Sequence, residues 1–165
     1  MKRMAFVGMV VVACLTAGCA NRQAAPRTVP GPPPPGSSAG GSSPTILPVV
    51  ATALMLRGTP YRNGGTDPSG FDCSGFVRYV FAQHGHILPR EVQSQYRSGT
   101  PIDRDRVRPG DLVFFQTVSR GASHVGIALG GNEFVHAPSS RGIVRVERYT
   151  IDYWATRWVG ARRIG

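Results

Sequence analysis

Two stretches of the chain carry apolar residues at the three- and four-residue spacing of an amphipathic helix. The first covers residues 45–57 and the second covers residues 73–84. Each is followed by a glycine, Gly58 or Gly85, which is typical of a helix end. A shorter helix is predicted over residues 91–98. Glycines and polar residues between positions 64 and 70 predict a loop directly before the second helix.

The second half of the chain has short apolar segments separated by turn residues, which is the pattern of β-strands. Strands are predicted over residues 111–116, 124–129, 133–137, 142–147 and 158–162. Helices followed by strands are typical of an α+β fold, so we expect helices packed on a mainly antiparallel sheet of about five strands. Residues 45–165 suffice for one hydrophobic core, and a single domain is expected there.

The N-terminal part has a different composition. Lys2 and Arg3 precede an uncharged apolar run over residues 4–12, and small residues then lead to Cys19. This run is shorter than the roughly 20 residues of a transmembrane helix and predicts an export signal over residues 1–18. Residues 19–44 consist mostly of proline, glycine and serine, which bury little apolar surface, so we expect a disordered tether.

The residues before Cys19 resemble a bacterial lipoprotein box, in which the cysteine is lipidated and becomes the first mature residue. Thr16 departs from the pattern, since leucine is usual three residues before the cysteine. Cys14 is a weaker candidate, and an ordinary secretory signal cleaved near Ala17 is the alternative. Because Ala20 rather than aspartate follows Cys19, the resemblance implies a lipid-anchored envelope protein, sorted to the outer membrane and facing the periplasm.

Cys73 is the candidate nucleophile. It lies where the glycine-rich loop gives way to the second predicted helix, and the other two cysteines belong to the signal or its end, so it has no disulfide partner. Backbone N–H groups and the helix dipole at such a helix start favour a thiolate. The alternative is a small buried apolar residue, against which the polar neighbours Asp72 and Ser74 argue.

Two histidines complete a candidate thiol-dependent site. His124 begins one predicted strand and His136 lies in the next, and the turn residues 130–132 predict a hairpin that brings the two rings together. His124 would then be the base for Cys73, oriented by His136. A zinc site of the same three residues is the alternative, although the sequence lacks short ligand spacings. His84 and His86 flank a predicted helix end and are left out of the site.

Seven collinear segments across residues 45–165 resemble the NlpC family of papain-like cell-wall peptidases. They are residues 60–65, 70–77, 88–90, 108–115, 123–127, 134–137 and 159–163. The resemblance implies a papain-like fold in which Cys73 is the nucleophile, His124 the base and His136 the orienting residue. It further implies that Tyr61 and Ser74 contribute to the oxyanion or substrate site.

The resemblance also implies a substrate, the stem peptides of peptidoglycan. The sequence shows no site for a metal or nucleotide cofactor, so none is expected. The bond is either the D-alanyl–diaminopimelate crosslink between stems or the γ-D-glutamyl–diaminopimelate bond within a stem, and a tethered single domain favours the crosslink. A non-catalytic wall-binding lipoprotein and an amidase that separates sugar from peptide are the alternatives. Some restraint on the enzyme is expected, because uncontrolled hydrolysis of the wall is lethal; proteolysis, a regulatory partner and simple positioning are the alternatives.

The formal net charge of +10 suits an anionic polymer. It falls by two to +8 when Lys2 and Arg3 leave with the signal, and arginine supplies all the remaining Lys/Arg charge. Export and the lack of a nucleic-acid motif argue against nucleic acid and favour the carboxylate-bearing wall. Arg62 and Arg90 are expected to be solvated surface charges rather than substrate ligands.

Overall fold

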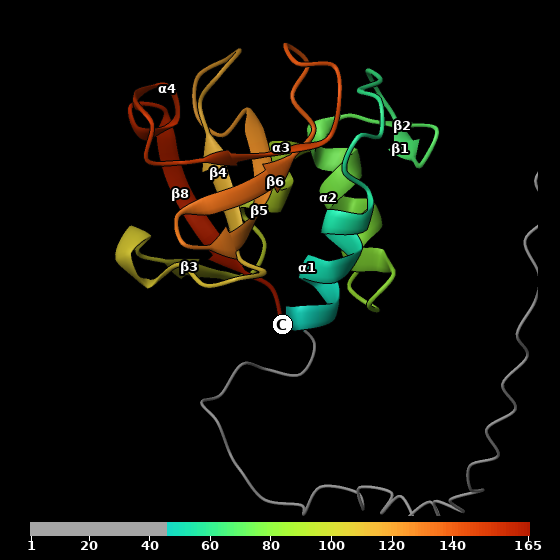
Figure 1. The fold of residues 1–165 in the computed structure, drawn as a ribbon. Coiled ribbons are helices and arrows are strands. Elements are labelled where there is room, and N and C mark those ends of the chain that lie inside the picture. Colours follow the sequence, from blue (N-terminus) through green and yellow to red (C-terminus); the bar gives the residue numbers. More distant parts are fainter. Residues whose placement is uncertain (1–45) are drawn as a thin grey trace, which may run out of the picture. The chain divides into compact units, whose positions relative to one another are not determined.

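The computed structural model describes residues 46–165, with side chains from residue 48 onward (Figure 1). The predicted signal segment, the tether, and the lipidation candidates Cys14 and Cys19 lie outside the described residues. Their roles therefore stay predictions. Within the described range, no helix is both long and apolar enough to cross a membrane.

Three helices follow the predicted ones closely. They are α1 (Ile46–Met55), α2 (Cys73–Ala82) and α3 (Val92–Tyr96). Beyond α1 and α2, Gly58 and Gly85 adopt φ angles of 86° and 83°, in the left-handed region that glycine tolerates, and this explains why those helices end there. A 3₁₀ turn, η1 (Arg104–Arg106), and a short helix, α4 (Asp152–Ala155), are elements that the hydrophobic pattern does not predict.

One antiparallel sheet of six strands forms the second half of the fold, in the order β3-β8-β4-β5-β6-β7. Its strands are β3 (Thr100–Ile102), β4 (Leu112–Phe115), β5 (His124–Gly130), β6 (Glu133–His136), β7 (Arg145–Arg148) and β8 (Trp158–Arg163). The predicted α+β class and antiparallel sheet are confirmed, and the unpredicted strand is the edge strand β3. A separate pair, β1 (Thr66–Asp67) and β2 (Gly70–Phe71), lies in the loop before α2.

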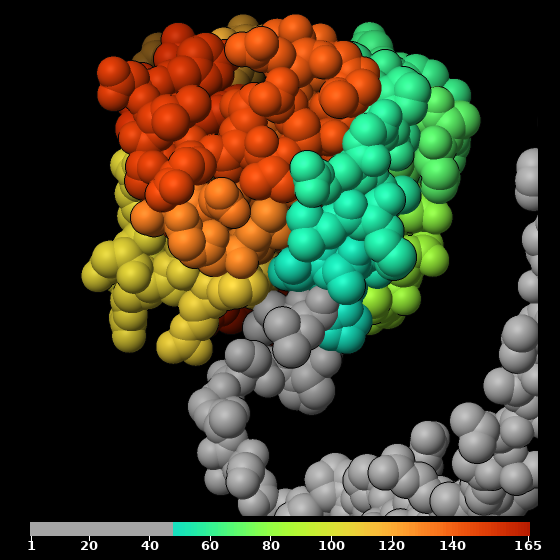
Figure 2. All heavy atoms as spheres, viewed as in Figure 1, coloured from blue at the N-terminus to red at the C-terminus, as the bar shows by residue number. Residues whose placement is uncertain are grey.

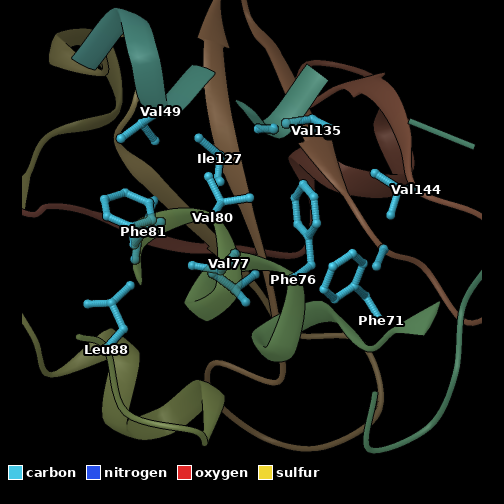
Figure 3. Packing of buried hydrophobic residues seen from close by; sticks show 14 of the residues in the cluster. Val49, Phe71, Phe76, Val77, Val80, Phe81, Leu88, Ile127, Val135 and Val144 are labelled. Carbon is cyan, nitrogen blue, oxygen red and sulfur yellow. The ribbon is translucent and has the colours of Figure 1, made fainter. Parts of the chain in front are cut away.

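Apolar layers cover both faces of the sheet. Helices α1 and α2 lie on one face, as Figure 1 shows, and Leu112, Phe114 and Ile127 point into that layer. Figure 3 shows the packing of this cluster around Phe76, Val77 and Val80 of α2. The opposite face carries Val113, Phe115, Ala128, Phe134, Tyr149, Trp154 and Ala161. Strand β4 is therefore buried on both sides, which explains its unbroken apolar run.

The segment after α1 closes against the loop that precedes β7. The backbone N–H of Gly58 donates to the carbonyl of Val144 (2.9 Å), and that of Tyr61 donates to the carbonyl of Gly142 (2.7 Å). Figure 2 shows these two parts of the chain, in cyan and orange, meeting along one seam. Tyr61 also forms a parallel bridge with Phe71. Together these bonds place Tyr61 next to the start of α2.

Candidate active site

Cys73 is the first residue of α2, and its helix start is held by Asp72. The Asp72 backbone is extended (φ −90°, ψ 176°), and its carboxylate Oδ1 accepts the N–H of Gly75 at 2.7 Å, which is an N-cap. The Cys73 thiol is half-buried and not in a disulfide. Backbone N–H groups of Ser74, Val125 and Cys73 itself lie at the sulfur. Since Val125 follows His124 directly, the thiol lies at the beginning of β5.

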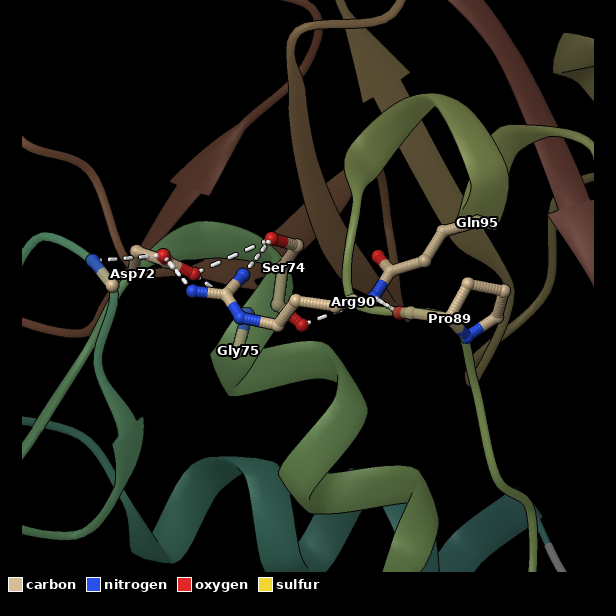
Figure 4. Close-up of polar contacts among 7 residues, drawn as sticks. Asp72, Ser74, Gly75, Pro89, Arg90 and Gln95 are labelled. Atoms are coloured by element: carbon tan, nitrogen blue, oxygen red, sulfur yellow. Dashed lines mark hydrogen bonds and ion pairs between the residues drawn. The ribbon is translucent and has the colours of Figure 1, made fainter.

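A polar network behind the helix start fixes its position (Figure 4). The Arg90 guanidinium forms an ion pair with Asp72 and donates from Nη1 to the hydroxyl of Ser74 at 2.7 Å. The Gln95 side-chain amide donates to the carbonyls of Ser74 (3.0 Å) and Pro89 (2.9 Å). The prediction that Arg90 is a solvated surface charge is therefore wrong. The Asp72 carboxylate caps its own helix and also binds the Arg90 guanidinium, which is distant in the sequence.

The glycine-rich loop packs directly on the first turn of α2. The N–H of Asp72 donates to the carbonyl of Gly65 at 3.1 Å, and a Cβ built on Gly75 would lie 2.0 Å from that carbonyl oxygen. Only glycine fits at position 75, because any side chain would displace the loop. The loop thus keeps Cys73 and its supporting network together.

The predicted β5–β6 hairpin brings His124 and His136 together, as expected. His124 Nε2 lies 2.7 Å from His136 Nδ1, and the ring centroids are 5.0 Å apart. His136 is fully buried and His124 is 7% exposed. Trp154, from α4, stacks on the His124 ring at 5.4 Å and meets the His136 ring edge to face. The aromatic surroundings shield the hydrogen bond between the two imidazoles from water.

Burial favours the neutral forms of the Cys73 thiol and of the two imidazoles at neutral pH. Burial, and then the adjacent Asp72 carboxylate, raise the pKa of the Cys73 thiol to about 11, even though three backbone N–H groups oppose the shift. Burial lowers the pKa of His124 to about 4. The expected resting thiolate is therefore disfavoured, because burial outweighs the helix start. Transfer of the thiol proton to His124 creates both charges together, and their attraction offsets part of the cost.

Tyr61 and Ser74 both lie near Cys73 but differ in the group that each offers. Burial, and then the charges of Cys73 and Asp72, raise the pKa of the Tyr61 hydroxyl, so this hydroxyl is within electrostatic range of the thiol. Ser74 directs its backbone N–H to the sulfur, while its hydroxyl lies between Arg90 and Asp72 (3.3 Å to Asp72 Oδ1). Its side chain supports the helix start, so a donor to substrate from Ser74 would be the backbone N–H.

Sequence reasoning missed two residues around the histidines, Trp154 and Glu147. Glu147, on β7, accepts a hydrogen bond from Trp154 Nε1 (2.5 Å) and lies 3.9 Å from His136 Nε2. An acidic residue on a half-buried edge strand is a weak signal for such a position, and nothing in the hydrophobic pattern points to Trp154. Within residues 46–165, no three His, Cys, Asp or Glu side chains lie close enough to hold a metal ion.

Comparison with known proteins agrees with this geometry. The model of the NlpC/P60 family matches residues 58–163, a range that contains every candidate site residue discussed for the folded part. The "Probable endopeptidase NlpC" of Escherichia coli K12 is 39% identical over 164 residues, which cover 98% of this chain and all of that protein. The two chains are thus similar over their full length.

Other relatives share the domain only. The "Murein DD-endopeptidase MepS/Murein LD-carboxypeptidase" of E. coli K12 is 43% identical over 66% of this chain and 57% of its own length. The "Gamma-DL-glutamyl hydrolase" of Bacillus subtilis is 39% identical over 71% of this chain and 28% of its own.

Solved structures show the same fold. The crystal structure of an NlpC/P60 family protein from Bacillus cereus superposes with a TM-score of 0.69 at 31% identity, covering 74% of this chain and 41% of that one. The papain-like arrangement expected from the sequence is therefore confirmed. With a family match across the domain, a relative similar end to end and a shared fold, this chain belongs to the NlpC/P60 family.

Proposed function

We propose that this protein is a peptidoglycan endopeptidase of the cysteine type, in which Cys73 is the nucleophile, His124 the base and His136 the residue that orients it. One observation carries the proposal: the 2.7 Å hydrogen bond between His124 Nε2 and His136 Nδ1, next to a thiol at the start of α2. Because His136 occupies Nε2, the Nδ1 nitrogen of His124 is the one left free to take the thiol proton.

The reaction is acyl transfer in two stages. The Cys73 sulfur attacks the peptide carbonyl carbon as its proton passes to His124, so an S–C bond forms and the carbonyl oxygen becomes an oxyanion. The N–H of Cys73 and the hydroxyl of Tyr61 receive the oxyanion. His124 then gives its proton to the leaving amine as the C–N bond breaks, and water hydrolyses the thioester to release the acid and restore the thiol.

The bond that we assign is the D-alanyl–diaminopimelate crosslink. The similarity to a protein named murein DD-endopeptidase supports this choice. The similarity to a gamma-DL-glutamyl hydrolase supports the alternative, the γ-D-glutamyl–diaminopimelate bond within a stem. The names of these two relatives thus point to different bonds, and the products distinguish the two reactions.

The masses of muropeptides released by the full-length protein in detergent test the assignment. Crosslinked dimers that become monomers identify the D-alanyl–diaminopimelate bond, and stems shortened after the γ-D-glutamyl residue identify the alternative. Release of intact stems from glycan would make the protein an amidase. Binding to the wall without any of these products would make it a non-catalytic wall-binding protein and overturn the proposal.

We further propose that Cys19 is lipidated and holds the protein at the outer membrane, facing the periplasm. The small residues before Cys19 and the Ala20 that follows support this placement. The N-terminal peptide of the protein purified from membranes should carry the mass of its lipids on Cys19, and a Cys19→Ser variant should appear in the soluble fraction. An unmodified N-terminus at residue 18 or 19 would indicate an ordinary secretory signal instead.

A further inference from the structure

Glu147 lies directly behind the histidine pair. Its Oε2 is 3.9 Å from Nε2 of His136, too long for a hydrogen bond but within reach of an ionic interaction. Among the residues that the structure describes, His136 Nε2 has no hydrogen-bond partner although the side chain is fully buried. The Glu147 side chain, 15% exposed, is held in place by the Trp154 indole N–H.

This inference rests on the proposed function, in which His124 is the base for Cys73. Given that role, the hydrogen bond between the two imidazoles determines which ring nitrogens carry protons. A base needs a free lone pair on Nδ1, so the neutral His124 ring carries its proton on Nε2 and donates it to Nδ1 of His136. His136 must then carry its own proton on Nε2. That N–H is the group that faces Glu147.

We propose that Glu147 is a positioning residue for the reaction: its carboxylate selects the Nε2–H tautomer of His136 and stabilises the positive charge that reaches the histidine pair when Cys73 loses its proton. The interacting groups are then, in order, the Glu147 carboxylate, the His136 ring, the His124 ring and the Cys73 thiol. Each group acts on the next one, and Glu147 touches neither substrate nor thiol.

The charge of Glu147 matters because another charge opposes it. The charged groups facing His136 are Arg145 and Glu147 from β7, with His124 as the titratable neighbour from β5. The Arg145 charge disfavours a cationic His136. Arg145 Nε lies 3.0 Å from Glu147 Oε1, an ion pair whose geometry is not that of a hydrogen bond. Without Glu147, the Arg145 guanidinium would act on the histidine pair unopposed.

The test replaces the charge and keeps the shape. Glu147→Gln retains an acceptor for the Trp154 N–H, and Glu133→Gln makes the same chemical change at an exposed position on β6. We expect kcat on crosslinked muropeptides to fall about tenfold in Glu147→Gln with KM and the thermal midpoint unchanged. The acid limb of the pH–rate profile should move to lower pH by roughly half a unit, because a cationic pair is harder to form. Glu133→Gln should match the wild type.

A second variant should shift the acid limb in the opposite direction, which a general folding defect would not do. Arg145→Gln removes the opposing cation and should move the acid limb to higher pH. If neither variant moves the limb, or if Glu147→Gln matches an active wild type in kcat, the role of Glu147 is wrong while the proposed function stands. A wild type that hydrolyses no wall substrate would instead overturn the proposed function itself.

Discussion

Gly126 lies against His136 across the β5–β6 hairpin, close enough that no side chain fits between them. A Cβ at position 126 would be 2.6 Å from Phe134 Cδ2, 2.8 Å from the carbonyl oxygen of Val135 and 3.0 Å from His136 Cβ. The close approach of the two strands at this glycine is what lets the His136 ring reach Nε2 of His124. The close packing of the two strands that carry the histidines therefore requires glycine at position 126.

The variant Gly126→Ala should displace β6 and break the histidine hydrogen bond. We expect hydrolysis of crosslinked muropeptides to slow at least about tenfold, and the free energy of unfolding to fall by about 1–3 kcal/mol. Gly160→Ala is the control, since the atoms nearest to its Cβ would be those of the Tyr96 side chain, with the hydroxyl oxygen at 3.0 Å. Equal rates for both variants would show that the hairpin contact does not control activity.

The ion pair between Arg90 and Asp72 should matter more than the one between Arg62 and Asp67. The first pair is largely shielded, with side chains 32% and 13% exposed, whereas the second is about half exposed on both sides. Arg90→Ala should lower the free energy of unfolding by about 1–3 kcal/mol and slow hydrolysis, because it loosens the N-cap beside Cys73. Arg62→Ala should change stability by less than about 0.5 kcal/mol. Chemical denaturation of both variants makes the comparison.

The Cys73 thiol should be neutral in the resting protein. Its pKa of about 11 lies far above neutral pH, so the ultraviolet absorbance of a thiolate, taken as wild type minus Cys73→Ser, should be absent at pH 7 and grow only as the pH approaches 11. Thiolate absorbance at pH 7 would instead establish a preformed ion pair with His124.

Acid should destabilise the fold through the histidine pair. Burial lowers the pKa of His124 to about 4, and burial also lowers the pKa of His136. Below about pH 6.5 the unfolded chain therefore binds protons on these histidines that the folded protein does not bind. Stability is therefore complete above pH 6.5 and declines as the pH falls toward 4, by roughly 1–3 kcal/mol for His124 alone. Urea midpoints should show this decline in the wild type and a smaller one in His124→Gln, with His86→Gln as the control. A midpoint independent of pH over this range would contradict the buried neutral pair.

Local sequence features were enough to predict the part of the site that one hairpin builds. The turn between the strands comprises Gly130, Gly131 and Asn132, all with positive φ, and it sets the spacing that pairs the two histidines. Glycines after α1 and α2 likewise marked the helix ends. These predictions succeed because the physical cause lies within a few residues of its effect.

Features that depend on distant parts of the chain could not be predicted. Arg90 binds Asp72 from 18 positions away, and Trp154 covers His124 from a short helix without a clear amphipathic pattern. Strand β3 contains Pro101 and lies at the sheet edge, where proline is tolerated but the usual alternating pattern is lost. The raised pKa of the Cys73 thiol is likewise a consequence of burial, which tertiary packing alone determines.

The central claim is that Cys73 forms a covalent acyl-enzyme with a stem peptide. Rapid acid quenching of the full-length protein with crosslinked muropeptides, followed by mass spectrometry of its peptides, tests this most directly. We predict that the peptide containing Cys73 gains the mass of the acyl part of the substrate, and that Cys73→Ala neither gains this mass nor cleaves the substrate. Cleavage by Cys73→Ala at the wild-type rate, with no adduct on Cys73 in the wild type, would contradict the account.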